Sequence, residues 1–253
     1  MVHISEVNIG LEHPEYVPVN MNSAISYGGS QMWYSADNKS SKDYVIHRYG
    51  CGTIAFADLL LYLALHKPSF ASPLTELALK GSDKPDYDNY RDYVYTIHDR
   101  YTKTQRILAV LGPKLGSTFN SYAKKQGLAY RGKWKLNLNS NRMLAMIQEM
   151  LHDNIPVILS IGPNTPKLWG KKGVYLYKKK SSEDFSSFQA TGQSINSHYV
   201  TITAIETSKI SGKIMLHISS WGKSYYIDYE EYRNYVDTAG GKFTSSILYI
   251  KQK

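Results

Sequence analysis

One stretch of the chain is apolar on almost every side. Residues 53–66 read TIAFADLLLYLALH, and Pro68 follows shortly after their end. A helix on the surface keeps one polar face, whereas a helix that is apolar nearly all round lies inside a domain. We therefore expect a buried central helix over residues 52–66, around which the rest of the chain must pack.

Helical periodicity dominates the chain as far as residue 154. Ser72 and Pro73 form an N-cap followed by proline at the first helical position, and Asn139 or Ser140 caps a later helix. Residues 1–44 instead hold many turn formers, so we expect an arm or loops that wrap the body. Besides the central helix, helices are expected over residues 74–79, 86–102, 114–126 and 142–153.

After residue 154 the pattern changes to that of short strands. Helices first and an antiparallel sheet second predict an α+β fold. No internal repeat or proline-rich linker divides the chain, so we expect one domain over residues 1–253, with an arm (1–44), a helical half (45–154) and a sheet half (155–253). Strands are expected over residues 155–161, 198–206, 213–220, 225–227 and 243–251, with a helix over 229–236 capped by Asp228.

The chain has one cysteine, Cys51, at the start of the expected central helix. A single cysteine excludes an intramolecular disulfide and a cysteine-rich zinc or iron–sulfur site. The free N–H groups and the dipole of a helix N-terminus stabilise a thiolate, and Gly50 and Gly52 allow a substrate to approach the sulfur closely. Cys51 is therefore a candidate nucleophile, and the alternative is an inert thiol packed in the core.

A thiolate nucleophile needs a base, and His198 is the best placed of the eight histidines. It opens the expected strand over residues 198–206. If the strand over residues 213–220 pairs with it across the intervening turn, Ser219 or Ser220 comes within reach of the imidazole and can fix its tautomer. Trp221 follows directly and can shield that contact from water.

These residues resemble the motifs of the papain-like cysteine peptidases. The order of the motifs is kept from about residue 45 to the end, and the separation of Cys51 and His198 falls within the roughly 130–150 residues typical of that family. The resemblance is closest to the bacterial branch that includes the bacteriocin-leader peptidases. The similar segments are Gly50-Cys51-Gly52, the strand at 156–161, Ser197-His198-Tyr199-Val200 and Ser219-Ser220-Trp221-Gly222, which matches Asn-Ser-Trp-Gly in three of four places.

The resemblance implies a papain-like fold and a cofactor-free acyl transfer, in which Cys51 attacks an amide or ester carbonyl and His198 is the general base. Two positions depart from the family pattern. Ser219 stands where the family has the Asn or Asp that orients the imidazole, and Val45 stands where it has the Gln that binds the oxyanion. Gln31 lies too far upstream to match that position, but a loop can bring it or Asn38 back to the site.

We expect a cysteine peptidase or amide hydrolase that acts on a peptide or protein. Two alternatives remain at this stage. The first is a catalytically weak or silent module of the same fold that binds a peptide or an anionic polymer. The second is an acyltransferase or transglutaminase-like enzyme, which also presents its cysteine before its histidine.

The charge balance is basic, with 30 Lys and Arg against 21 Asp and Glu. Because charge runs usually serve solubility, we interpret a lysine-rich connection before His198 as a solvated hairpin, and steering of an acidic substrate is the alternative. This connection carries Lys167, Lys171, Lys172, Lys178, Lys179 and Lys180.

Several classes of site and partner have no signal in the sequence. No His, Asp or Glu group has metal-ligand spacing and no glycine-rich phosphate loop occurs, so we expect no metal and no cofactor. We also expect no specific nucleic-acid binding and no membrane span. The N-terminus lacks a signal-peptide pattern, which predicts a cytoplasmic protein, or a secreted one if a leader was removed before residue 1. The sequence sets no oligomeric state.

Overall fold

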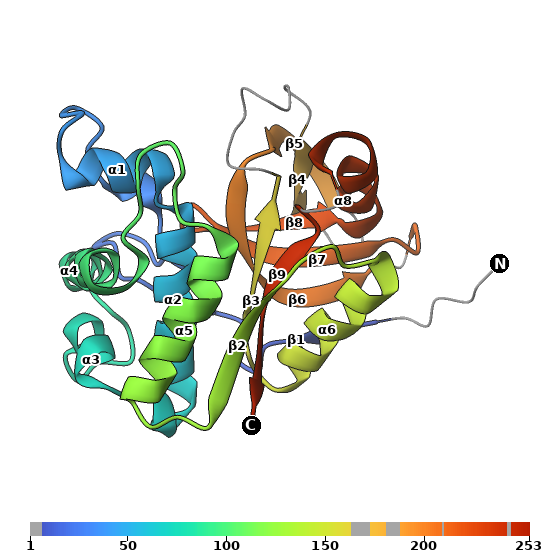
Figure 1. The fold of residues 1–253 in the computed structure, drawn as a ribbon. Coiled ribbons are helices and arrows are strands. Elements are labelled where there is room, and N and C mark those ends of the chain that lie inside the picture. Colours follow the sequence, from blue (N-terminus) through green and yellow to red (C-terminus); the bar gives the residue numbers. More distant parts are fainter. Residues whose placement is uncertain (1–6, 163–172, 181–187, 209, 242–243) are drawn as a thin grey trace.

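The computed structural model describes residues 7–162, 173–180, 188–208, 210–241 and 244–253, which form a group of helices beside an antiparallel sheet (Figure 1). The α+β class predicted from the sequence is therefore confirmed. The described helices are α1 (Lys42–Tyr49), α2 (Cys51–His66), α3 (Pro73–Leu79), α4 (Tyr87–Ile97), α5 (Gly112–Lys125), α6 (Ser140–His152) and α8 (Tyr229–Tyr235).

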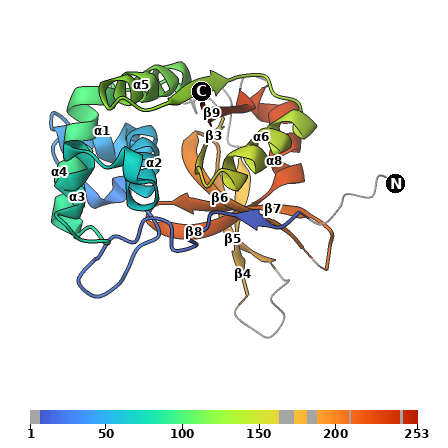
Figure 2. The same cartoon turned by 90° about the horizontal axis from the view of Figure 1, so that it is seen from below.

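Helix α2 is the buried central helix that the apolar stretch predicts. Every residue from Cys51 to Ala64 is buried. On one side α2 packs against α3 and α4, and on the other it packs against the sheet. Figure 2 shows this arrangement, with α2 between the outer helices and the strands. The apolar side chains of both halves belong to one hydrophobic cluster.

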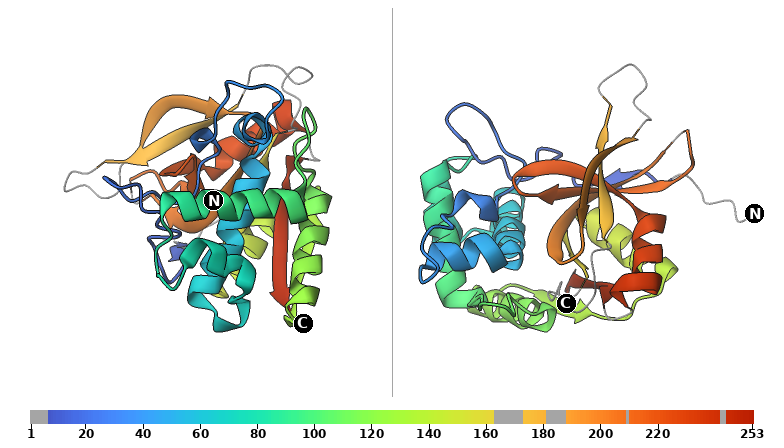
Figure 3. Two further views of the ribbon diagram at one scale, coloured as in Figure 1. Left: turned by 90° about the vertical axis from the view of Figure 1, so that its left-hand side faces the viewer. Right: turned by 90° about the horizontal axis from the view of Figure 1, so that it is seen from above.

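The described strands form one nine-stranded antiparallel sheet in the order β2-β9-β3-β6-β7-β8-β4-β5, with β1 beside β6. Figure 3 shows helices α1 to α5 grouped beside the strands, whereas α6 and α8 lie in the half of the molecule that holds the sheet and pack directly against its strands. The strands are β1 (Ile9–Gly10), β2 (Tyr130–Lys135), β3 (Val157–Ile161), β4 (Val174–Lys179), β5 (Phe188–Ile195), β6 (His198–Thr207), β7 (Ile214–Ser220), β8 (Lys223–Asp228) and β9 (Ser246–Gln252).

Several elements differ from the sequence expectations. Residues 1–44 include β1, and α1 begins at Lys42. The helix expected over residues 86–102 ends as α4 at Ile97 and continues as a π-helical turn. Within the half expected to be helical, β2 adds an edge strand by pairing with β9. The caps at Asn139 and Asp228 are confirmed, because each side chain accepts a hydrogen bond from a backbone N–H of its helix.

A sharp bend separates α1 from α2. The two helices meet at 86°, with Gly50 between them. A Cβ atom on Gly50 would lie 2.3 Å from the carbonyl oxygen of Ile46, so only glycine fits this bend. The bend leaves the N-terminus of α2 free at Cys51.

No single helix in the described part of the chain is both long and apolar enough to cross a bilayer, and α1 and α2 reach that length only as a bent pair.

Candidate active site

Cys51 is the first residue of α2 and lies under a close-packed cover. Its helix has no side-chain cap, so the first backbone N–H groups of α2 remain available near the thiol. A Cβ atom on Gly52 would lie 2.3 Å from Val110 Cγ1 and 3.0 Å from the ring of Tyr199. Glycine at this position therefore lets both side chains pack over the start of the helix, and the cysteine is only 8% exposed.

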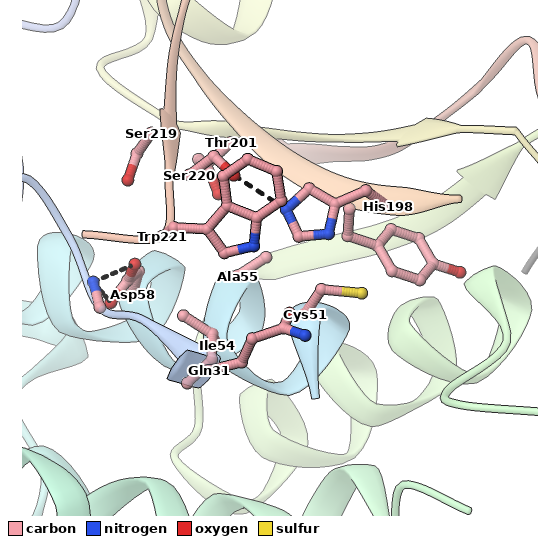
Figure 4. A pocket seen from close by; sticks show the side chains of 12 residues that line it. Gln31, Cys51, Ile54, Ala55, Asp58, His198, Thr201, Ser219, Ser220 and Trp221 are labelled. Carbon is pink, nitrogen blue, oxygen red and sulfur yellow. Dashed lines mark hydrogen bonds between the residues drawn. The ribbon is translucent and has the colours of Figure 1, made fainter. Parts of the chain in front are cut away.

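His198 is the first residue of β6, and the sheet brings it next to Cys51. Its Nε2 atom shares a hydrogen bond of 2.8 Å with Ser220 Oγ. The indole of Trp221 stacks on the imidazole, with 4.7 Å between ring centroids and 26° between ring planes. In Figure 4 the second ring nitrogen of His198 lies on the side of Cys51. The imidazole is thus held on one edge and one face, with its free edge toward the thiol.

The turn between β7 and β8 explains how Trp221 reaches the imidazole. The two strands pair as far as Ser220 and Lys223, so Trp221 and Gly222 form a two-residue hairpin loop. Both loop residues have positive φ, 51° and 72°, as in the type I′ hairpin turn. A bulky residue rarely adopts positive φ, which costs about 1–3 kcal/mol. The packing of the indole on His198 holds Trp221 in this conformation.

Ser219, which the resemblance aligns with the family's orienting residue, lines the same cavity but bonds another segment of the chain. Its hydroxyl donates a hydrogen bond of 2.7 Å to the carbonyl oxygen of Tyr27, and Ser220 takes the place beside the imidazole. A β-bulge is the reason: the register between β6 and β7 shifts between Ile202 and Ala204, so that Ser219 pairs with Thr201. A shift of one residue exchanges the faces of a strand, and it moves Ser220 to the face of His198.

Gln31 is brought to the site by the loop, as the sequence analysis allowed. It lines the same cavity as Cys51 and His198, and its side chain extends toward Cys51 (Figure 4). Its Nε2 atom donates a hydrogen bond of 2.7 Å to the carbonyl oxygen of His47, whereas its Oε1 atom is buried with no partner among the described residues. The second Nε2 proton is available to a ligand in the cavity.

Asp58 is a polar residue of the site that the sequence analysis missed. It lies two turns after Cys51 on α2 and lines the same cavity. Its carboxylate accepts hydrogen bonds from the backbone N–H of Gly29, at 2.9 and 3.2 Å, and from the hydroxyl of Tyr90, at 2.6 Å. Asp58 therefore anchors the loop that carries Gln31. The available signal was its position as the one charged residue in an otherwise apolar helix.

Two connected spaces surround these residues. An inner cavity of about 20 Å³ lies between α2 and the ends of β6 and β7, with room for about one water molecule. An open groove of about 850 Å³ adjoins it, and Gln31, His198 and Trp221 line both. Arg48 and Lys223 also line the groove, and no acidic residue does so among the described ones.

Burial shifts the pKa values of the central groups toward their neutral forms. It raises the pKa of the Cys51 thiol, although backbone N–H groups of Tyr199, Gly52 and Cys51 favour the thiolate. It lowers the pKa of His198 to about 4. It also raises the pKa of Asp58 to about 7, against the effect of the hydrogen bonds from Tyr90 and Gly29. Cys51 and His198 are therefore largely uncharged near pH 7, whereas Asp58 titrates close to that pH.

The lysine-rich connection forms part of the sheet. The antiparallel pair β4 and β5 spans its described part. Lys178 and Lys180 are exposed, and Lys179 makes an ion pair of 2.6 Å with Glu206. The Lys178 ammonium lies 5.9 Å from the ring centre of Tyr225, which lines the groove. Three of the six lysines lie outside the described residues: Lys167, Lys171 and Lys172.

One group of side chains in the described part of the chain has the composition of a metal site, and it lies apart from the cavity. His13, Glu15 and His66 bring possible ligand atoms within 4.8 Å of one another. Their spacing in the sequence gave no sign of this, because two of them lie in the N-terminal arm and the third ends α2.

Three comparisons with known proteins identify no relative of this chain. Neither the models of known protein families, nor curated proteins, nor solved structures give a match to this chain.

Proposed function

We propose that the chain is a papain-like cysteine peptidase or a related amide hydrolase, with Cys51 as nucleophile and His198 as general base. The observation that carries the proposal is the way His198 is held. Its imidazole is hydrogen-bonded to Ser220, stacked against Trp221 and directed at the one cysteine of the chain. Packing alone does not require a strained tryptophan over a buried imidazole beside a helix N-terminus.

In this mechanism Nε2–H of His198 donates to Ser220 Oγ, which leaves the Nδ1 lone pair free. Nδ1 takes the thiol proton while Sγ forms a bond to the substrate carbonyl carbon. The oxyanion accepts hydrogen bonds from the backbone N–H of Cys51 and from Gln31 Nε2. The C–N bond then breaks as Nδ1 returns its proton to the leaving amine, and water hydrolyses the thioester by the reverse proton route.

The groove supports an acidic peptide as substrate. Its charged lining residues are Arg48 and Lys223, and Lys178 lies against Tyr225 at its edge. Positive charge along a cleft raises the encounter rate with anionic ligands. We expect Lys223→Glu to raise the KM for an acidic peptide, while Lys114→Glu, an exposed substitution on α5, leaves it unchanged.

Alkylation by iodoacetamide tests the proposal, because the chain has one cysteine and the intact mass therefore reports Cys51 alone. We expect Cys51 to react faster than free cysteine at pH 6 and His198→Ala to abolish this advantage. Digestion of a peptide library by the wild type and by Cys51→Ala then tests turnover. Equal cleavage by the two proteins, or no cleavage by either, would contradict the proposed hydrolase.

A second candidate function is a silent binding module of the same fold. The burial of Cys51 favours it, because burial raises the pKa of the thiol and lowers that of His198, which works against a thiolate–imidazolium pair. The binding-module hypothesis predicts that iodoacetamide reacts more slowly with Cys51 than with free cysteine. It also predicts that acidic peptides bind without being cleaved.

A further inference from the structure

Three possible metal ligands meet at the C-terminal end of α2. His66 is the last residue of the helix, and its ring stacks on His13 with 3.6 Å between ring centroids and 8° between ring planes. His13 Nδ1 lies 3.6 Å from Glu15 Oε1. All three side chains offer a ligand atom within 4.8 Å of the other two. Two imidazoles and a carboxylate are the ligand types that bind Zn²⁺ and similar ions.

The Nε2 atom of His66 is buried and has no hydrogen-bond partner among the described residues. A buried polar atom without a partner costs roughly 1–3 kcal/mol, so such atoms are rare in native structures. A metal ion bound at this nitrogen would remove the cost. The orphaned atom is thus a second indication of a ligand, independent of the clustering of the side chains.

The segment that carries His13 and Glu15 is fixed by Asn154. The Asn154 side chain accepts a hydrogen bond of 3.1 Å from the backbone N–H of Glu12 and donates one of 3.1 Å to its carboxylate. The hydroxyl of Tyr62, on α2, donates to the same Asn154 oxygen at 2.5 Å. Asn154 therefore joins the N-terminal arm to α2 at Glu12, the residue before His13, and at Tyr62, whose ring lies 4.5 Å from that of His66.

We propose that His13, Glu15 and His66 bind one divalent transition-metal ion, for which Zn²⁺ is the best match. Ligand atoms of a tetrahedral zinc ion lie roughly 3.3 Å apart, so the stacked rings must open and the three side chains move inward by about 1 Å. Three protein ligands leave the fourth position to water. The site lies about 22 Å along α2 from Cys51. It links the arm to the helix and is separate from the candidate active site.

Isothermal titration with ZnSO₄ and with MgCl₂ tests this site in the Cys51→Ala protein, in which no thiol can bind metal. We expect one Zn²⁺ per chain and no Mg²⁺, since magnesium prefers oxygen ligands. A hundredfold zinc excess over Kd should raise the melting temperature by about 5–10 °C. Absence of zinc binding at micromolar concentration would overturn the proposal, as would a stoichiometry that never approaches one.

Ligand variants in the same background identify the site. His13→Ala and Glu15→Gln change half-exposed side chains, so the variants should fold, and we expect zinc to bind at least about tenfold more weakly to each. His152→Ala is the matched control, because His152 is exposed and also lies beside a carboxylate, that of Asp153. Zinc affinity that falls equally in all three variants, or in none, would show that the ion binds elsewhere.

Discussion

The cavity beside Cys51 has two walls that are held in different ways. On the helical wall, backbone sterics fix the geometry: Gly50 makes the bend before α2, and Gly52 admits Val110 and Tyr199 over the helix start. On the sheet wall, side chains fix it, through the hydrogen bond of His198 to Ser220 and the stacking of Trp221. Both walls lie within one hydrophobic cluster, but the geometry of the sheet wall depends on single side chains.

The two walls also carry buried titratable groups of opposite kinds. Burial raises the pKa of Asp58 on the helical wall to about 7 and lowers the pKa of His198 on the sheet wall to about 4. Folding therefore favours a protonated carboxyl on one wall and an unprotonated imidazole on the other. The contributions of the two groups to stability should depend on pH with opposite signs.

Among substitutions in the two walls, the largest effect on the rate of acylation should come from His198. We expect His198→Ala to slow acylation of Cys51 by p-nitrophenyl acetate by about 10²–10⁴-fold, because general base catalysis is lost. His217→Ala is the matched control: His217 also lies on the sheet and is partly buried, bonds a serine through Nε2 at 2.6 Å and has a pKa lowered to about 4. Equal rate losses in the two variants would mean that His198 acts only through the fold.

Asp58→Asn should change how stability depends on pH. The pKa of Asp58 is raised in the folded state, so between about pH 4 and pH 7 the unfolded chain has lost a proton that the folded chain keeps. The free energy of unfolding of the wild type should therefore fall relative to the variant as the pH rises through this window, by a few kcal/mol at most. Urea unfolding at several pH values measures the difference.

Tyr90→Phe gives a second test of how Asp58 makes stability depend on pH. The Tyr90 hydroxyl lowers the pKa of Asp58 by its hydrogen bond to the carboxylate. Its removal should raise the upper end of the window in which stability falls, because the folded-state pKa of Asp58 rises while the unfolded-state pKa stays the same. His198 is present in both proteins, and its opposite contribution cancels when they are compared. A wild-type to Asp58→Asn difference that stays constant from pH 4 to pH 8 would contradict the buried carboxyl.

Gly50→Ala tests whether the helical wall depends on backbone sterics. A Cβ atom there would meet the backbone of Ile46, which cannot rotate away, and we expect a loss of about 2–3 kcal/mol in the free energy of unfolding. Gly81→Ala is the control. A Cβ atom on Gly81 would face open space, so only the positive φ of 78° should cost stability, by about 1 kcal/mol. Equal losses would remove the special role of the bend.

The helical wall was predictable from the sequence because its signals are local. A stretch that is apolar on almost every side, a proline and two glycines fix α2 and place Cys51 at its start. The sheet was predicted less completely. Strand β2 reads YRGKWK, in which Tyr130, Gly132 and Trp134 alternate with three basic residues, and this short alternation was the available signal for an edge strand that pairs with β9. Asp58 and the metal-ligand group depend on contacts between segments far apart in sequence, which no spacing rule reveals.

The register of β7 against β6 could not be predicted from the local sequence. The sequence places a serine pair opposite the start of β6, but only the bulge between Ile202 and Ala204 decides which serine faces His198. The structure selects Ser220, and Ser219 instead holds the carbonyl oxygen of Tyr27. Substitutions of these two adjacent serines can therefore separate an effect on catalysis from an effect on stability.

Ser220→Ala should remove the hydrogen bond from the imidazole to Ser220 Oγ and free its tautomer, and we expect acylation of Cys51 by p-nitrophenyl acetate to slow by about tenfold, or about 1.4 kcal/mol. Ser219→Ala should cost about 1 kcal/mol of stability by leaving the Tyr27 carbonyl without its donor, with an acylation rate close to wild type. A rate loss in Ser219→Ala that exceeds that in Ser220→Ala would return the orienting role to Ser219, and with it the register that an unbulged strand pair predicts.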